Sequence, residues 1–181
     1  WKYDKVLSKR QPGSTFKLFV YSEGFNKGLS PCDERIDQYI EWDVLEDGKP
    51  AKWIPHNANG IYTGDTMTLK AAFARSINTI AVQIAREAGI PNIIKTAHAM
   101  GIKTPLNETP AVSLGASDVS LLELVNAYGT VINDGMVHDP VMVTRIEDKN
   151  GKIIYRHKQE QKQALPYETA FLMTQMLMAG L

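Results

Sequence analysis

One stretch near the start of the chain decides how the rest is interpreted: Arg10-Gln11-Pro12-Gly13-Ser14-Thr15-Phe16-Lys17. The Pro12-Gly13 pair is typical of a turn, so we expect a helix to begin at Ser14. The residues from Phe16 to Tyr21 would make that helix apolar on almost every side, and such a helix is a buried one. Gly24 and Gly28 are expected to close it.

Ser14 and Lys17 could carry chemistry. Residues at positions i and i+3 share a helix face, so the amine of Lys17 can reach the hydroxyl of Ser14. A serine is a weak nucleophile until a base takes its proton, and a buried lysine can be that base when its pKa falls. The alternative is that Ser14 only caps the helix and Lys17 is an ordinary solvated lysine.

Ser76-Ile77-Asn78 is the second candidate. It lies between two predicted helical segments, Leu69 to Arg75 and Asn78 to Ala88. Ser76 could pass a proton to a leaving group, and Asn78 could both donate to and accept from a substrate amide. The alternative is that both residues are helix caps, with Asn78 capping the second segment.

The segment from Leu29 to Gly64 is rich in Pro, Gly, Asp and Asn. We expect a long irregular excursion anchored by Trp42 and Trp53, and a loop of that length in a compact domain is usually functional.

The remaining elements are mostly helices. One starts at Pro91 and stops at Gly101, and the capping box Ser120-Leu121-Leu122-Glu123 introduces another. Asn150-Gly151 predicts a β-hairpin within residues 140–158, with strands from Val141 to Asp148 and from Lys152 to His157. Pro166 begins a last helix, whose expected inward residues are Phe171, Leu172, Met176 and Leu177.

Composition excludes several classes of function. Lys plus Arg equals Asp plus Glu at 20 each, so no net charge attracts nucleic acid. Cys32 is the only cysteine, which rules out an intrachain disulfide. The histidines have no second ligand at metal spacing, and we expect no metal or cofactor. No apolar run reaches the ~18–20 residues of a membrane span, so any anchor would lie outside these residues.

The segment from Arg10 to Lys17 closely resembles the active-site serine segment of penicillin-binding proteins, especially the bifunctional glycosyltransferase/transpeptidase type. Further matches follow in the family's order and carry most of the weight: Pro55-His56-Asn57, Gly60, Tyr62, Gly64, Thr68-Leu69, Ser76-Ile77-Asn78, Leu114-Gly115-Ala116-Ser117, Val119-Ser120, Leu122-Glu123, Asn126-Ala127-Tyr128, Asp134-Gly135 and Pro140.

The resemblance implies an α+β fold of the penicillin-binding-protein/serine β-lactamase type, with 1–181 as a partial transpeptidase domain. The family's third motif, Lys-Thr-Gly, does not occur here and is expected beyond Leu181. We therefore expect a mainly α chain with a β-hairpin at 140–158 and most of the central antiparallel sheet missing. Such a piece would be nearly inactive alone, and its uncovered apolar surface would favour self-association.

The resemblance also implies roles. Ser14 would attack the D-Ala-D-Ala end of a peptidoglycan stem peptide, with Lys17 as its base and Ser76 as the proton relay. Asn78 and Tyr62 would bind the substrate. β-Lactam antibiotics would acylate the same serine, on the extracytoplasmic (periplasmic) face of the bacterial cytoplasmic membrane.

Three alternatives stay open at this point. A D,D-carboxypeptidase or a serine β-lactamase would share the first two motifs and differ in using water to release the acyl group. A non-catalytic β-lactam-binding or structural module could share the fold. A helical interaction domain would use the same residues as caps and surface groups.

Overall fold

The computed structural model describes residues 4–180, so the ends of the predicted domain, 1–3 and 181, lie outside the described residues. The described part is mainly helical, as predicted. Its α-helices are α1 (Lys17–Asn26), α2 (Leu69–Ala74), α3 (Asn78–Ala88), α4 (Ile90–Ala99), α5 (Leu121–Ile132) and α6 (Tyr167–Met178).

Strands are short, and within residues 4–180 they pair only two by two. The antiparallel pairs are β1 (Lys9–Arg10) with β6 (Val119–Ser120), β2 (Glu34–Ile36) with β5 (Thr66–Thr68), β3 (Trp42–Glu46) with β4 (Lys49–Trp53), β7 (Met136–His138) with β10 (Gln161–Gln163), and β8 (Arg145–Glu147) with β9 (Ile153–Arg156).

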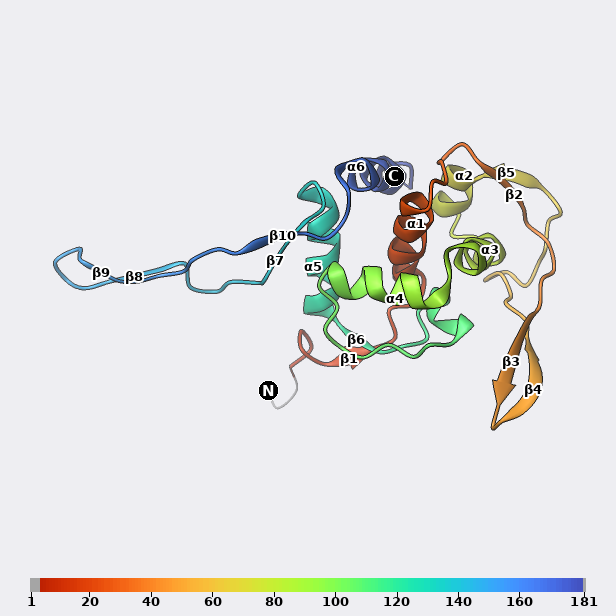
Figure 1. The fold of residues 1–181 in the computed structure, drawn as a ribbon, viewed down its shortest axis with the longest axis horizontal. Helices are drawn as coiled ribbons and strands as arrows, with labels where there is room; N and C mark the ends of the chain where they lie inside the picture. The colour runs from red at the N-terminus through yellow and green to blue at the C-terminus, as the bar shows by residue number, and fades with distance from the viewer. Residues whose placement is uncertain (1–3, 181) are drawn as a thin grey trace.

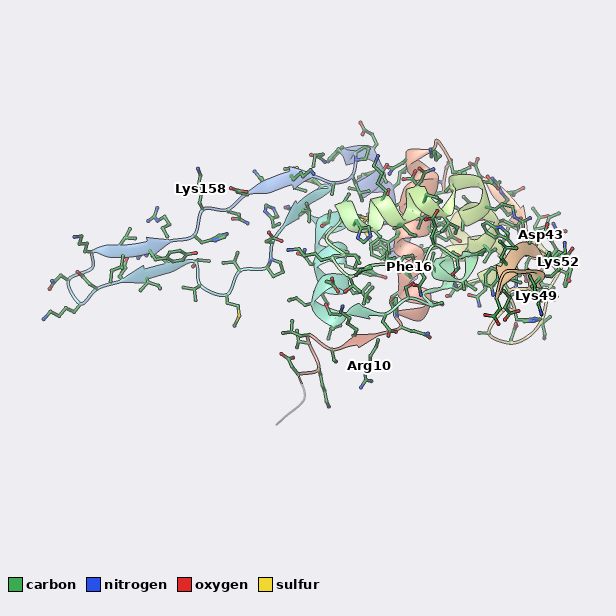
Figure 2. All side chains as sticks on the ribbon, turned by 60° about the horizontal axis from the view of Figure 1, so that its bottom comes forward. Arg10, Phe16, Asp43, Lys49, Lys52 and Lys158 are labelled. Atoms are coloured by element: carbon green, nitrogen blue, oxygen red, sulfur yellow. The ribbon has the colours of Figure 1, made fainter. Side chains whose placement is uncertain are left out.

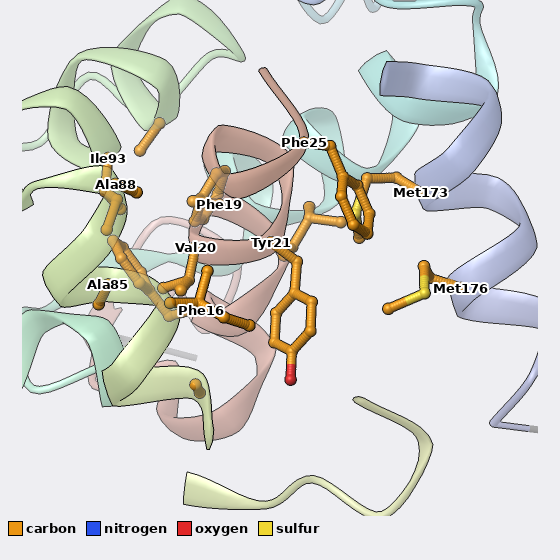
Figure 3. Packing of buried hydrophobic residues seen from close by; sticks show 14 of the residues in the cluster. Phe16, Phe19, Val20, Tyr21, Phe25, Ala85, Ala88, Ile93, Met173 and Met176 are labelled. Atoms are coloured by element: carbon orange, nitrogen blue, oxygen red, sulfur yellow. The ribbon is translucent and has the colours of Figure 1, made fainter. Parts of the chain in front are cut away.

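Helix α1 lies at the centre of the molecule, with α3, α4 and α6 packed around it (Figure 1). Its residues from Lys17 to Phe25 are all buried, which confirms the prediction of a helix without an exposed face. Phe19, Val20 and Phe25 project from it toward different neighbours in the core (Figure 3).

Gly24 does not close α1, which runs on to Asn26. A Cβ atom at Gly24 would lie 2.9 Å from Cγ2 of Ile84 in α3. The glycine therefore allows α1 and α3 to approach each other closely, and the chain reverses only afterwards, at Gly28 with φ 98°.

The excursion predicted from Leu29 to Gly64 contains a hairpin that the prediction missed. Strands β3 and β4 are joined by Asp47-Gly48, whose φ angles are 50° and 75°, as a tight hairpin turn of this composition requires. Trp42 and Trp53 lie opposite each other at its base. Charged side chains such as Asp43, Lys49 and Lys52 cover the hairpin (Figure 2).

Asn150-Gly151 lies in the turn of a second hairpin, where Oδ1 of Asp148 accepts hydrogen bonds from the N–H groups of Asn150 and Lys152. Its strands, β8 and β9, are shorter than predicted, and every residue in them is exposed. With β7 and β10 this hairpin forms a long arm that leaves the helical body beside α5 and α6 (Figure 1).

Two helix starts follow signals in the sequence, whereas the helix expected from Ser14 begins as a 3₁₀ turn, Gly13–Phe16, and becomes α-helical only at Lys17. The side chain of Thr68 caps α2, and the capping box of Ser120 and Glu123 at the start of α5 is formed in both directions. One inward assignment in α6 is wrong, since the side chain of Phe171 is 52% exposed. The buried stripe of α6 follows Thr169, Met173 and Met176, and helical periodicity turns Phe171 away from it. No helix within residues 4–180 has the length and apolar character needed to cross a bilayer.

Candidate active site

Ser14 and Lys17 are brought together by a 3₁₀ turn, Gly13–Phe16, that leads directly into α1. Side chains at i and i+3 eclipse each other in a 3₁₀ helix, and Nζ of Lys17 lies 3.2 Å from Oγ of Ser14. The capping alternative for Ser14 is wrong, because the N-cap residues of the turn and of α1 are Pro12 and Phe16.

The amine of Lys17 is almost fully enclosed, with only 2% of the residue exposed. Besides Ser14, three oxygens at or just before the start of α3 lie within hydrogen-bond distance of Nζ: the carbonyl of Ser76 at 2.8 Å, Oγ of Ser76 at 2.9 Å and Oδ1 of Asn78 at 2.6 Å. These four acceptors share the three N–H groups of the ammonium. Lys17 is therefore not a solvated surface residue. Its nitrogen joins the two sequence motifs in one cluster.

Burial lowers the pKa of Lys17 from 10.5 to about 8, because removing the ammonium from water disfavours the charged form. At pH 7 this leaves roughly a tenth of the molecules with a neutral amine, against well under a thousandth for an exposed lysine. A neutral amine can accept the proton of a serine hydroxyl, so the site can supply a base near neutral pH.

Ser76 reaches Lys17 through an unusual backbone conformation. Its φ is 55°, in the left-handed region that costs a non-glycine residue about 1–3 kcal/mol. That conformation lets the carbonyl and the hydroxyl of the same residue both contact Nζ of Lys17. Strain of this kind is often found at functional sites.

Asn78 is the first residue of α3, but its side chain does not cap the helix. The N-cap is Ile77, so the capping alternative for Asn78 is wrong as well. Its Oδ1 accepts from Lys17, and its Nδ2 donates to the carbonyl of His56 at 2.7 Å. The amide is thus held at both ends, with its oxygen toward the amine.

Tyr62 is connected to the four-residue cluster only through His56. Its hydroxyl is 2.8 Å from Nδ1 of His56 and 3.2 Å from the carbonyl of Pro55, and its ring packs edge-on against Tyr39. Tyr62 therefore contacts the residue whose carbonyl holds Asn78, and among the hydrogen bonds of residues 4–180 it makes none to Lys17 or Ser14.

Gly115 has a place in the site that sequence reasoning did not assign. Its φ is 80°, and a Cβ atom there would lie 2.2 Å from the carbonyl oxygen of Gly13. Only a glycine lets the two backbones meet directly behind Ser14. The signal was present in Leu114-Gly115-Ala116-Ser117, which was noted only for its resemblance.

Asp37, His56 and Asn57 were also missed as contributors to the site. The segment Pro55-His56-Asn57 was part of the resemblance, but no pattern in the sequence connects it to Asn78. Asp37 is a single carboxylate in an irregular segment and gave no signal.

Among residues 4–180, no three His, Cys, Asp or Glu side chains are grouped so as to hold a metal ion.

The fold is mainly helical α+β, and it brings a serine, a buried lysine, a second serine and an asparagine into contact. Residues 1–179 match the family described as the penicillin binding protein transpeptidase domain. The chain belongs to this family, which confirms the resemblance seen in the sequence.

Curated relatives include penicillin-binding protein 2D of Bacillus subtilis (strain 168), 32% identical over 170 residues, and penicillin-binding protein 1A of Rickettsia prowazekii (strain Madrid E), 35% identical over 156 residues. The matches cover 94% and 86% of this chain, but only 24% and 19% of those proteins. The chain therefore spans a quarter or less of their length.

Solved structures share the fold. Penicillin-binding protein 1A from Haemophilus influenzae superposes with a TM-score of 0.86 at 24% identity, over 97% of this chain and 30% of that one. Penicillin-binding protein A from M. tuberculosis, in its penicillin G acyl-enzyme complex, gives 0.80 at 21% identity, over 97% and 45% of the two chains.

Proposed function

We propose that these residues form part of a D,D-transpeptidase, which cross-links peptidoglycan stem peptides through a serine acyl-enzyme. The observation that carries this proposal is the position of the Lys17 amine, within 3.2 Å of Ser14 Oγ and 2.9 Å of Ser76 Oγ. A base in contact with two hydroxyls can take a proton from one while the other relays a proton onward.

In the acylation step the neutral amine of Lys17 accepts the hydroxyl proton of Ser14. The Ser14 oxygen then attacks the carbonyl carbon of the penultimate D-alanine and forms a tetrahedral intermediate. When the C–N bond breaks, Ser76 passes a proton to the departing nitrogen and regains one from Lys17. The terminal D-alanine leaves as a neutral amine, and the acyl group remains on Ser14 as an ester.

In the second step an amine of a neighbouring stem peptide attacks the ester. Lys17, again neutral, receives the proton that the attacking amine loses, and the proton returns to Ser14 as the ester bond breaks. The products are a new amide cross-link and the free serine. A β-lactam would follow only the first step, since its opened ring stays attached and blocks the acceptor amine.

Asn78 and Tyr62 are assigned to substrate binding. Nδ2 of Asn78 donates one hydrogen to the carbonyl of His56 in this structure, and its second hydrogen could be donated to a substrate carbonyl without turning the amide. Tyr62 presents a half-buried ring beside His56, so it would contact the substrate at the outer edge of the cluster.

We assign this activity to the full-length protein, on the extracytoplasmic face of the cytoplasmic membrane, with residues 1–181 as part of one transpeptidase domain. The N–H of Ser14 would supply one donor to the oxyanion. The motif Lys-Thr-Gly does not occur in these 181 residues, and the resemblance assigns a second donor to its strand. Because one such donor is worth about a hundred- to thousandfold in rate, we expect the 181 residues alone to be nearly inactive.

The test is to incubate the full-length protein with a fluorescent penicillin and to locate the label by mass spectrometry. We expect a covalent adduct on Ser14 that is absent from Ser14→Ala. A folded full-length protein that forms no adduct would refute the proposal. Fast, stable labelling of the 181-residue chain would refute only its predicted inactivity.

A second measurement separates cross-linking from hydrolysis. The full-length protein is given a stem peptide ending in D-Ala-D-Ala together with an acceptor peptide that carries a free amine. Release of D-alanine with formation of the joined peptide supports transpeptidation. Release of D-alanine with only the shortened donor peptide would show that water takes the acyl group, as in a carboxypeptidase.

A further inference from the structure

A buried carboxylate lies behind the asparagine of the site. Asp37 follows strand β2, its residue is 0% exposed, and within residues 4–180 no lysine, arginine or histidine forms an ion pair with it. An unpaired buried charge is costly unless hydrogen bonds replace its water. Its position therefore needs an explanation.

Four hydrogen bonds hold the Asp37 carboxylate. Its Oδ1 accepts from Oγ1 of Thr79 at 2.6 Å and from Nδ2 of Asn57 at 2.8 Å. Its Oδ2 accepts from the N–H and the hydroxyl of Thr63, both at 3.1 Å. Burial raises the pKa of Asp37, but the hydrogen bonds from Thr79, Thr63 and Asn57 outweigh it, and the pKa lies below its usual value. The group is therefore an anion at neutral pH.

Asn57 connects this anion to the start of α3. Its Nδ2 donates to Asp37 and to the carbonyl of Ile61, each at 2.8 Å. Its Oδ1 therefore points the other way, where it accepts from the N–H groups of Asn78 at 2.9 Å and Thr79 at 3.3 Å. Ile77, the N-cap residue, has no side chain that could serve these groups. Asn57 thus caps α3 from a distant part of the sequence.

The same segment also fixes the side chain of Asn78. The residue before Asn57 is His56, whose carbonyl accepts from Nδ2 of Asn78. If the amide of Asn78 were turned by half a rotation, its NH₂ group would face the ammonium of Lys17 and its oxygen would face the carbonyl of His56, so both hydrogen bonds would be lost. The orientation seen here, with Oδ1 toward Lys17, depends on where the His56 carbonyl is held.

We infer that Asp37 is a positioning residue of the site: through Asn57 and the adjoining His56 carbonyl it fixes the amide of Asn78 with its oxygen on the Lys17 amine. Asp37 touches neither the reacting hydroxyl nor the amine. The inference rests on the proposed function for its effect on rate, but its structural content, the path from Asp37 through Asn57 and His56 to Asn78 and Lys17, does not.

The test is a double-mutant cycle with Asp37→Asn and Asn78→Ala. An asparagine at position 37 has the same shape, but its NH₂ group cannot accept from the donors that surround it. The Lys17 titration is followed by NMR of ¹³C- and ¹⁵N-labelled lysine, assigned with Lys17→Arg, in this chain. The rate of acylation by a fluorescent penicillin is measured in the full-length protein.

We expect Asp37→Asn to slow acylation about ten- to hundredfold, the scale of a small misplacement of a catalytic group, and to lower the pKa of Lys17 because the ammonium loses an oriented acceptor. In the Asn78→Ala background the same substitution should change the rate less than about twofold. Non-additivity of this kind shows that two residues act through each other.

The control is Glu23→Gln, which weakens another buried carboxylate, bonded to Thr96 and Asn26, with no link to Asn78 among its hydrogen bonds. Glu23→Gln should lower stability about as much as Asp37→Asn, but it should leave the Lys17 titration and the acylation rate unchanged. Additive effects in the cycle, or an Asp37→Asn protein with an unchanged rate and titration, would overturn the inference.

If Asp37→Asn does not fold, Thr79→Val removes one donor to the carboxylate and should shift both readouts in the same direction by less; no shift would overturn the inference. If the parent protein folds but Ser14 is never acylated, the proposed function fails, while the NMR cycle still decides whether Asp37 acts on Lys17 through Asn78.

Discussion

Nζ of Lys17 lies 2.6 Å from Oδ1 of Asn78, so the first residues of helices α1 and α3 meet in a single hydrogen bond. A buried ammonium needs an acceptor such as this one in place of water. The same burial lowers the pKa of Lys17 and so makes the amine available as a base. Each property of the site that can be tested follows from how the fold holds these two helix starts together.

The first prediction concerns pH. Since a neutral amine is required, the acylation rate of the full-length protein should rise about tenfold per pH unit below pH 8 and level off above it. Lys17→Met should lower the rate by about a hundredfold or more and abolish the pH-dependent rise. Stopped-flow labelling across pH 6–10 measures both, and a flat profile for the parent protein would exclude Lys17 as the base.

The same titration affects stability in a definite direction. Lys17 has a lower pKa in the folded protein, about 8, than in the unfolded chain, near 10.5. Between these values the unfolded chain binds more protons, so the contribution of Lys17 to the free energy of unfolding should increase with pH from about 8 to 10.5. Below pH 8 it should be constant. Lys17→Met should lack this increase in urea titrations.

The second prediction concerns the glycine behind the serine. Gly115→Ala should destabilise the protein by about 2 kcal/mol or more, through left-handed strain and a clash with Gly13, and should also slow Ser14 acylation. The matched control is Gly129→Ala in α5, where a Cβ atom meets nothing within 4 Å. It should stabilise by about 0.5–1 kcal/mol. Equal effects of the two substitutions in urea unfolding would refute this account.

The third prediction concerns a buried hydroxyl. Oη of Tyr21 is inaccessible and has no hydrogen-bond partner within residues 4–180, although its ring packs edge-on against Phe73 and Phe25; burial also raises the pKa of Tyr21. Tyr21→Phe should therefore stabilise by about 1 kcal/mol. Tyr128→Phe, which removes a hydroxyl that donates to the carbonyl of Thr15 at 3.0 Å, should destabilise by a similar amount. A less stable Tyr21→Phe protein would mean that the hydroxyl is satisfied after all.

The fourth prediction concerns the capping box of α5. Burial raises the pKa of Glu123, but hydrogen bonds from Ser120, Lys103 and Thr104 outweigh this and bring it down to about 2. As pH falls below 4.5, the unfolded chain takes up a proton before the folded protein does, so this stabilisation is present above pH 4.5 and is lost toward pH 2.

At pH 7 Glu123→Gln should cost about 1–2 kcal/mol, and the difference from the parent should shrink in the same acid range. The exposed Glu108 serves as a control, since Glu108→Gln should change little. A difference that is constant from pH 7 to 2 would argue against an ionised cap.

The fifth prediction concerns self-association. Leu121, Val125 and Ile132 form an exposed stripe on α5, with Ile132 72% exposed, and Phe171 lies exposed on the adjoining α6. Apolar patches of this kind favour association. The sedimentation coefficient of the 181-residue chain should rise with concentration, and Val125→Glu should suppress the rise. Leu45→Glu, at a 76% exposed position on the β3–β4 hairpin, should not. A clean monomer at high concentration would contradict the prediction.

Much of this architecture could be predicted because its signals are local. The turn before Ser14, the capping box at Ser120 and the Asn150-Gly151 hairpin each depend on a few consecutive residues. The Asp47-Gly48 hairpin was equally local, and it was missed because the surrounding Pro, Gly and Asp residues suggested an irregular loop. The end of α1 was misplaced because Gly24 serves a contact with Ile84, which the local sequence does not reveal.

The candidate site divides in the same way. Ser14 and Lys17 are neighbours on one turn, so their contact follows from spacing. The contact of Lys17 with Ser76 and Asn78 was expected only through the resemblance, since 59 and 61 positions separate them in the sequence. Asp37 and Asn57 act through long-range hydrogen bonds between irregular segments, and neither hydrophobic periodicity nor a helix-cap pattern in the sequence predicts such bonds.

The left-handed backbone of Ser76 has a consequence for how this site should be dissected. One of its two contacts with the amine is made by a main-chain oxygen, which every genetically encoded amino acid at position 76 retains. An alanine scan would remove the hydroxyl and leave that acceptor in place. A residual rate in Ser76→Ala would therefore include the contribution of this main-chain oxygen, and an ester in place of the following amide bond would be needed to weaken that acceptor by itself.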